Sequence, residues 1–185
     1  MFRKRHSLLA AAALAVALLS SGVSAQPLTV AQARASLIGR WTGELDADPG
    51  SALMRWPMAT EITDAGDGAT LIERQVIRRV PGDGGRLVTI VSMLDRDGAT
   101  EHRSQLTLGT PPEHSTLTLS LASARDAAHW TLLGVEDYVH EGRALQSRTR
   151  TVRDGDTLVI EFEVDPAGEE PAFGRVRWTL RRAAQ

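Results

Sequence analysis

The sequence contains no cysteine, and this absence excludes several structures at once. The chain can form no disulfide, offers no thiolate ligand to a metal ion, and has no cysteine to carry a lipid anchor. Lysine is also missing after Lys4, so every later basic residue is an arginine. A protein of this composition must draw its stability from one continuous hydrophobic core.

Long apolar runs are confined to the N-terminus. A basic segment, Arg3–Arg5, precedes the apolar run Leu8–Leu19, and Val23-Ser24-Ala25 has the small residues of a cleavage site. This pattern predicts a signal peptide over residues 1–25, cleaved after Ala25, and therefore a periplasmic or secreted protein. An uncleaved N-terminal anchor is the alternative, but the apolar run is shorter than the about 20 residues that span a membrane.

The remaining chain is mildly acidic. Residues 26–185 keep all 23 acidic residues but only 18 of the 21 basic ones, which gives a net charge of −5. That balance argues against nucleic acid or anionic lipid as the main partner. The length suits one domain. We predict a leader and short helix over residues 26–36 and a single domain over residues 37–185.

Turn signals divide the chain into short segments that alternate polar and apolar residues, as in Leu117, Leu119 and Leu121. No later helix is long enough for a crossover between parallel strands. A meander of about nine or ten antiparallel strands can remove its exposed edges by closing. The pattern predicts an all-β, antiparallel, up-and-down barrel with a short N-terminal helix at Val30–Ser36. The turn signals are Asp46–Gly50, Asp64–Gly68, Pro81–Gly85, Asp95–Gly98, Gly109–Pro112, Asp154–Asp156 and Pro166–Gly174.

A Gly-x-Trp-x-Gly motif opens the first predicted strand. Side chains alternate along a strand, so Gly39, Trp41 and Gly43 share one face, with the indole between two residues that lack side chains. Such a tryptophan can plug the closed end of a barrel while neighbouring strands approach across the glycines.

This motif, a short helix before it and the terminal segment Arg175–Arg182 together resemble lipocalin-like proteins, the calycin group. The chain is most similar to exported bacterial proteins that share this barrel and whose function is not known. The resemblance implies that Trp41 opens the first strand and that a late arginine, Arg177 or Arg181, packs across it at the closed end. The absence of a disulfide departs from the classical lipocalin pattern.

The segment from Gly142 to Arg153 is unusual because neither of its faces is apolar. Arg148 and Arg150 lie on one face, and Ser147, Thr149 and Thr151 lie on the other. If the arginines point inward, they can bind a ligand carboxylate or phosphate. The alternative is that the hydroxyl residues point inward and the arginines are solvated, because burying an unpaired arginine is costly.

Four further residues are candidate ligand contacts. Tyr138 and His140 share a face with Glu136, a set that can orient a polar ligand or supply a general base. His102 is a similar candidate, although an ordinary half-buried strand explains these residues equally well. Trp56 and the proline after it suggest an edge strand or bulge at the barrel mouth, or else ordinary core packing.

No cofactor follows from the sequence. The later histidines have no close spacing and no cysteine beside them, so we predict no metal site. Haem bound through His140 or His129 is an alternative that no flanking motif supports.

Three functions remain open. The first is an exported barrel that carries or senses a small, largely apolar molecule, with an anionic group in one version. The second is a structural or interaction protein with a filled core that acts through its loops or strand edges. The third is an enzyme with Tyr138, His140 and His102 inside the barrel. A cavity of a few hundred cubic ångströms favours the first or third function. The oligomeric state is open.

Overall fold

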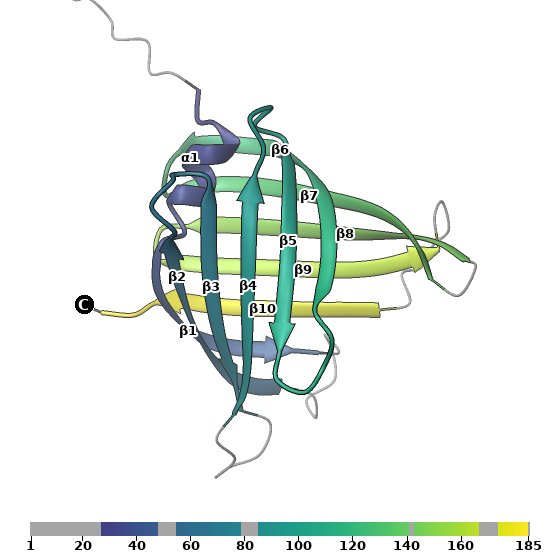
Figure 1. The fold of residues 1–185 in the computed structure, drawn as a ribbon. Helices are drawn as coiled ribbons and strands as arrows, with labels where there is room; N and C mark the ends of the chain where they lie inside the picture. The colour runs from purple at the N-terminus through teal and green to yellow at the C-terminus, as the bar shows by residue number, and fades with distance from the viewer. Residues whose placement is uncertain (1–26, 48–54, 79–84, 141–142, 167–173, 185) are drawn as a thin grey trace, which may run out of the picture.

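The computed structural model describes residues 27–47, 55–78, 85–140, 143–166 and 174–184, without the side chains of residues 138–140, 143, 165, 166 and 174. These residues form one helix and ten strands, which close in sequence order into an antiparallel barrel (Figure 1). The predicted all-β barrel is therefore confirmed. The predicted signal peptide lies outside the described residues. The elements are α1 Val30–Ala35, β1 Gly39–Asp46, β2 Arg55–Asp64, β3 Thr70–Ile77, β4 Arg86–Leu94, β5 Thr100–Thr107, β6 Glu113–Asp126, β7 His129–His140, β8 Arg143–Asp154, β9 Thr157–Pro166 and β10 Gly174–Arg182.

Helix α1 begins at a capping box. The backbone N–H of Gln32 donates to Oγ1 of Thr29 at 3.2 Å, and the backbone N–H of Thr29 donates to the Gln32 side chain at 2.9 Å. The helix packs at one end of the barrel, where Ala33 is fully buried near Trp130 in a cluster of apolar side chains. In the described part of the chain, no helix is long and apolar enough to cross a membrane.

The Asp-Gly turns form because their carboxylates satisfy backbone donors. In the β2–β3 turn the Asp67 carboxylate accepts the side-chain and backbone donors of Thr70 and the backbone N–H of Ala69. These bonds favour the ionised form and lower the pKa of Asp67 to about 2. Asp97 repeats the arrangement in the β4–β5 turn, where backbone donors also lower its pKa. These two turns match the predicted positions.

The helix end of the barrel is closed by packed side chains. Trp41, Leu158 and Leu180 are almost completely buried there, and the Trp41 indole N–H donates to the Leu37 carbonyl at 2.8 Å. Two arginines lie against the Trp41 ring, which is 4.8 Å from the Arg182 guanidinium and 5.8 Å from that of Arg153. Trp41 is thus the plug that the opening motif predicts.

The prediction that Arg177 or Arg181 covers this tryptophan is wrong. Arg182 pairs with Trp41 in the β1–β10 ladder, and its guanidinium also donates to the Ser36 carbonyl at 3.0 Å. Arg177 and Arg181 have the opposite parity along β10 and therefore point outward. Arg177 forms an ion pair with Glu161 on the outer face, with a 2.6 Å contact.

Gly43 is required by a close approach of β1 and β10. A Cβ atom at this position would lie 2.0 Å from the backbone oxygen of Thr179 and 2.9 Å from Cα of Leu180. We expect Gly43→Ala to lower the free energy of unfolding by about 1–3 kcal/mol, because two backbones must separate. Chemical denaturation measures this loss.

Gly134 supplies the matched control. An added Cβ there meets the ends of the Leu117 and Leu119 side chains at 3.1 Å, and these can shift, whereas Cβ of Thr149 lies at an ordinary contact distance of 3.7 Å. Gly134→Ala should therefore cost less than Gly43→Ala. Equal losses for the two variants would contradict the close approach of β1 to β10.

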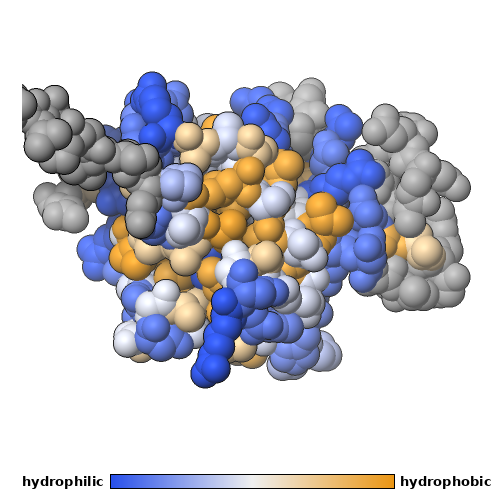
Figure 2. Space-filling view, turned by 90° about the horizontal axis from the view of Figure 1, so that it is seen from above, coloured by the Kyte–Doolittle hydropathy of each residue, from blue (hydrophilic) through white to orange (hydrophobic). Residues whose placement is uncertain are grey.

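The outer wall is mixed in character. Figure 2 shows a face on which apolar side chains gather in the middle and hydrophilic side chains surround them. The described strands also carry exposed large apolar side chains, among them Leu87 and Leu106.

Candidate functional site

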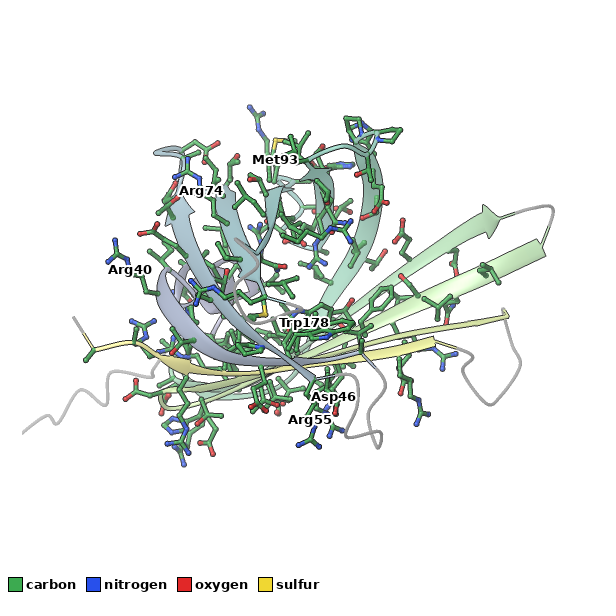
Figure 3. All side chains as sticks on the ribbon, turned by 90° about the horizontal axis from the view of Figure 1, so that it is seen from below. Arg40, Asp46, Arg55, Arg74, Met93 and Trp178 are labelled. Atoms are coloured by element: carbon green, nitrogen blue, oxygen red, sulfur yellow. The ribbon has the colours of Figure 1, made fainter. Side chains whose placement is uncertain are left out.

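The barrel wall opens between β6 and β7. The ladder that joins these strands stops at the pair Thr118–Val135, although β6 begins at Glu113 and β7 continues to His140. The last part of β7 pairs only with β8, and this hairpin reaches out beyond β6 (Figures 1 and 3). At the other end of this ladder, β6 has two register shifts, after Leu121 and after Ala124.

A hollow of about 460 Å³ lies at this opening. Register places Arg103, Ser115 and Glu136 on the inner face of their strands, whereas His102 and Thr116 have the opposite parity and face outward. Side chains from both faces of the wall therefore line the hollow. Its lining residues are His102, Arg103, Ser104, His114, Ser115, Thr116, Glu136 and Asp137.

Glu136 bridges the opening. Its carboxylate accepts a hydrogen bond from the Ser147 hydroxyl at 3.3 Å and another from the backbone N–H of Thr116, across the gap on β6. Burial raises the pKa of Glu136, and these two bonds and the charge of Arg103 oppose that rise only in part. The site therefore holds a carboxyl group that gains a proton more readily than an exposed glutamate.

Arg103 brings a positive charge to the same hollow from a buried ion-pair chain. Its Nε lies 2.5 Å from one carboxylate oxygen of Glu101, and the other oxygen lies 2.5 Å from Nε of Arg34 on α1. Arg34 and Glu101 are almost fully buried, whereas about a third of the Arg103 side chain is exposed. Arg103 is thus held in place from the closed end and lines the hollow at the opening.

The outer rim of the hollow consists of polar side chains that lie within hydrogen-bond distance of one another. The two ring nitrogens of His102 lie 3.1 Å from Oγ1 of Thr116 and 3.2 Å from a carboxylate oxygen of Asp95. On the same two strands, Nδ1 of His114 lies 2.9 Å from the Ser104 hydroxyl. Within the described residues, no group of three His, Cys, Asp or Glu side chains is placed to hold a metal ion.

The interior behind the hollow has one polar and one apolar wall. Ser147 and Thr149 of β8 point inward and are buried, next to the inward face of β9 and β10. That face carries Phe162, Val176 and Trp178, which are only partly buried although register points them into the barrel. Figure 3 labels Trp178 among the strands. These side chains lie in the half of the barrel away from the plug at Trp41, which we call the mouth half.

Two buried donors in this region are unused. Among the described residues, neither Oγ1 of Thr149 nor the indole N–H of Trp178 has a hydrogen-bond partner. Buried polar atoms are usually paired, since leaving one unpaired costs about 1–3 kcal/mol. Both donors can bond an acceptor atom if the packing around them opens.

The predicted ligand contacts are distributed over both faces of the wall. Arg148 and Arg150 point outward, and Arg150 pairs with Glu161 at 3.1 Å, so the alternative with inward hydroxyl groups holds for β8. His102 also points outward, to the rim of the hollow. Trp56 points inward and packs against the core. Its strand has a neighbour on each side, so β2 is not an edge strand.

The remaining predicted contacts are only partly placed. Tyr138 and His140 belong to β7, but their side chains lie outside the described residues. His129, one candidate haem ligand, lies on the outer surface with its ring 2.7 Å from Asp126 and 3.5 Å from Asp154.

Sequence reasoning missed Arg103 and Ser115. The signal that points to them is that β5 has polar residues on both faces, which is the same signal that singled out β8.

Comparisons with known proteins support the fold alone. No protein-family model matches the sequence, and a search of the curated proteins finds no similar sequence. The crystal structure of Rv2717c from M. tuberculosis is similar over 85% of this chain and 99% of that chain, with 17% identity and a TM-score of 0.57. A protein of unknown function from the DUF3598 family of Nostoc punctiforme aligns over 84% of this chain and 100% of its own at 12% identity. Its TM-score of 0.24 is too low to show a shared fold.

The raised pKa of Glu136 leads to a pH-dependent prediction. The folded protein binds this proton more tightly than the unfolded chain, so the ionised carboxylate costs stability at neutral pH and the cost disappears below the usual pKa of 4.5. We expect Glu136→Gln to be more stable than the wild type at pH 7 and equally stable at pH 3, as measured by urea denaturation.

Glu161 supplies a control of opposite sign. Burial acts to raise its pKa, but hydrogen bonds from Arg177 and Arg150 outweigh it and lower the pKa. Glu161→Gln should therefore be less stable than the wild type at pH 7. If both variants shifted stability in the same direction, the assignment of Glu136 would be wrong.

Proposed function

We propose that the protein binds a small, largely apolar molecule in the mouth half of the barrel and admits it through the opening between β6 and β7. The observation that carries this proposal is the polar hollow of about 460 Å³ that is lined from both faces of the wall, in a barrel whose β9 and β10 carry a partly buried apolar inner face. Pockets for small ligands have volumes of about 300–1,000 Å³ and combine apolar walls with a few polar groups.

The two walls suggest how the ligand is oriented. Its apolar part would pack on the face that carries Phe162, Val176 and Trp178, where aromatic rings provide large contact areas. Its polar end would lie toward Ser115 and Glu136 at the opening. An acceptor atom on the ligand would also give the unused donors of Thr149 and Trp178 a partner.

A ligand with an anionic group would use a different arginine from those that the sequence suggested. Arg148 and Arg150 point away from the interior, whereas Arg103 reaches the hollow from the inside. Because Arg103 is already bonded to Glu101 and lies near Glu136, a neutral polar end suits this site better than a carboxylate.

We also propose that the protein carries or senses this small molecule outside the cytoplasm. This part of the proposal rests on the signal-peptide pattern of residues 1–25, which would direct the chain to the periplasm or the exterior. A barrel that binds a largely apolar molecule there would keep it in solution. The competing structural role needs a filled interior. The core cluster fills the closed end with Trp41, Leu158 and Leu180, and Val176 and Trp178 pack against it.

Ser115 offers a direct test. Ser115→Phe places a ring in the hollow from the inner face of β6, and we expect it to weaken binding of the fluorescent probe 8-anilinonaphthalene-1-sulfonate by at least about tenfold, or 1.4 kcal/mol. Fluorescence titration measures the affinity. Ser120→Phe makes the same change on the outer face of the same strand and should bind like the wild type. Equal affinities of the two variants would refute entry at this opening.

A further inference from the structure

The opening between β6 and β7 separates two strand ends that have the right register to pair with each other. Beyond the last ladder pair, Thr118–Val135, β6 has five further residues that begin at Glu113, and β7 has five that end at His140. In the same register these residues would form five more pairs, the last of them Glu113–His140. Each strand end is paired on its other side, β6 with β5 and β7 with β8. The opening is therefore a length of antiparallel ladder that the two strands have not formed.

Backbone hydrogen bonds show which groups of the two strand ends face each other. The N–H of Leu119 donates to the Ala99 carbonyl at 2.6 Å, on the β5 side of β6. Backbone groups alternate in direction along a strand, so the N–H of Thr116 points to the other side, toward β7. The Ala128 carbonyl accepts a bond from the β8–β9 turn at 2.8 Å, and by the same alternation the backbone groups of Asp137 point toward β6. Thr116 and Asp137 would thus be the next hydrogen-bonded pair of the ladder.

The carboxylate of Glu136 occupies the donor that this next pair needs. It accepts the backbone N–H of Thr116, which a continued ladder would give to the Asp137 carbonyl. The Ser147 hydroxyl donates to the same carboxylate at 3.3 Å and helps to hold it there. Hydrogen bonds to an ionised acceptor are roughly twice as strong as those between neutral groups. The Glu136 side chain therefore competes with the backbone of its own strand for the Thr116 N–H.

Continuation of the ladder would also bury the Glu136 carboxylate more deeply. It would place Glu136 opposite Leu117, an inward side chain that is only 2% exposed. The carboxylate, which is now partly buried, would lose the Thr116 bond and much of its contact with water. An ionised carboxylate resists such burial, whereas a protonated one does not. The ionised form of Glu136 therefore favours the open wall, and the neutral form favours the continued ladder.

We propose that the opening between β6 and β7 is a gate, which Glu136 keeps open by holding the backbone N–H of Thr116. When the carboxylate releases this donor, the end of β7 moves to β6, and the ladder continues to Glu113 and closes the wall. The gate itself is independent of ligand binding. Its consequence, that closure would trap a bound molecule, rests on the proposed function.

Protonation of Glu136 is the event that closes the gate. Burial raises the pKa of this carboxyl, so it gains its proton at a higher pH than an exposed glutamate does. Ser147, its partner on β8, carries no charge. Histidines change charge between about pH 5 and 8, so those at the opening must be tested separately. The charged or titratable groups placed around the carboxylate are Arg103 and His102 of β5, Glu113 and His114 of β6, and Asp137 of β7.

Introduced cysteines test the gate, because the chain has none of its own. Thr116→Cys and Asp137→Cys are combined in one protein as the test pair. In the closed gate their Cα atoms would lie about 5.5 Å apart, within the range of a disulfide. Ser120→Cys with Leu133→Cys is the control pair, since these residues are already paired on the outer face of the same two strands. Intact mass after treatment with diamide and alkylation gives the rate of disulfide formation, expressed as the ratio of the test pair to the control pair.

Adding Glu136→Gln to both cysteine pairs should raise this ratio at least about tenfold at pH 7.5, because the amide is uncharged and accepts the Thr116 N–H more weakly. With Glu136 in place, the ratio should rise as the pH falls from 7.5 to 5, whereas with Glu136→Gln it should stay constant. The control pair cancels the effect of pH on thiol reactivity. Adding His102→Gln and His114→Gln should leave the rise unchanged.

Several results would overturn the proposal. Equal ratios with and without Glu136→Gln would show that the carboxylate does not keep the gate open. A test pair that never cross-links, in a protein whose control pair does, would show that the ladder does not continue. A pH response that survives Glu136→Gln, or that disappears with the two histidine changes, would assign it to the histidines. Hydrogen exchange of the Asp137 amide checks the cysteine-free protein: Glu136→Gln should slow it, and an unchanged rate would contradict the gate.

Discussion

Replacing Trp41 by alanine is expected to lower the free energy of unfolding by about 3–5 kcal/mol, the usual loss for a buried aromatic side chain. Trp41 is completely buried, and its indole N–H is bonded to the Leu37 carbonyl. Its ring also supports the guanidinium groups of Arg153 and Arg182, which bind the Ser36 carbonyl after α1. The alanine variant therefore leaves a large cavity under two partly buried charges, and urea denaturation measures the loss.

Two control variants show how much of this loss of stability comes from the buried ring and how much from its hydrogen bond. Trp41→Phe keeps an aromatic ring but removes the bond to Leu37, and should cost about 1–2 kcal/mol, the value of one hydrogen bond and a smaller side chain. Thr42→Ala changes the next residue, whose side chain is exposed, and should alter stability by less than about 0.5 kcal/mol. A Trp41→Ala protein as stable as Thr42→Ala would mean that Trp41 does not close the barrel.

The second large effect is expected at the ion pair of Arg34 and Glu101. Both side chains are more than nine-tenths buried, and Arg34 also donates to the carbonyl oxygens of Ala69 and Ser92. Removing one member of a buried pair leaves the other charge unbalanced and costs about 3–5 kcal/mol. We expect this loss for Arg34→Met and for Glu101→Leu, measured separately by urea denaturation.

The double variant distinguishes the pair from its separate members. With Arg34→Met and Glu101→Leu together, no charge is left buried alone, so the total loss should be smaller than the sum of the two single losses. The double variant should still be less stable than the wild type, because Arg103 loses its bond to Glu101. Strictly additive losses would show that Arg34 and Glu101 act independently, against the contact between them.

Turn spacing and alternation were enough to predict the barrel because they are local properties of the chain. The Asp-Gly turns at Asp67 and Asp97 satisfy their own backbone donors, so their positions do not depend on distant residues. The plug at Trp41 was predicted for the same reason, since parity along β1 decides which side chains point inward. The covering arginine was missed although alternation along β10 places Arg182, and not Arg177 or Arg181, on the inward face with Trp178 and Leu180. Register adds that Arg182 lies opposite Trp41.

The candidate site could be predicted only in part. Neither face of β8 is apolar, so its sequence could not decide whether Arg148 or Thr149 points inward. The neighbouring strand decides it, because Thr149 pairs with the inward-facing Phe162. The opening itself depends on where the β6–β7 ladder stops, and no local pattern near Thr118 marks that point.

The central claim is that the mouth half of the barrel holds a small molecule, and native mass spectrometry of the purified protein tests it most directly. The account predicts a discrete extra mass that is lost on denaturation, and that is absent from Ser115→Phe but retained by Ser120→Phe. A bare protein mass that persists after titration with lipid and with haem, or an extra mass retained equally by both variants, would contradict a ligand site at the opening between β6 and β7.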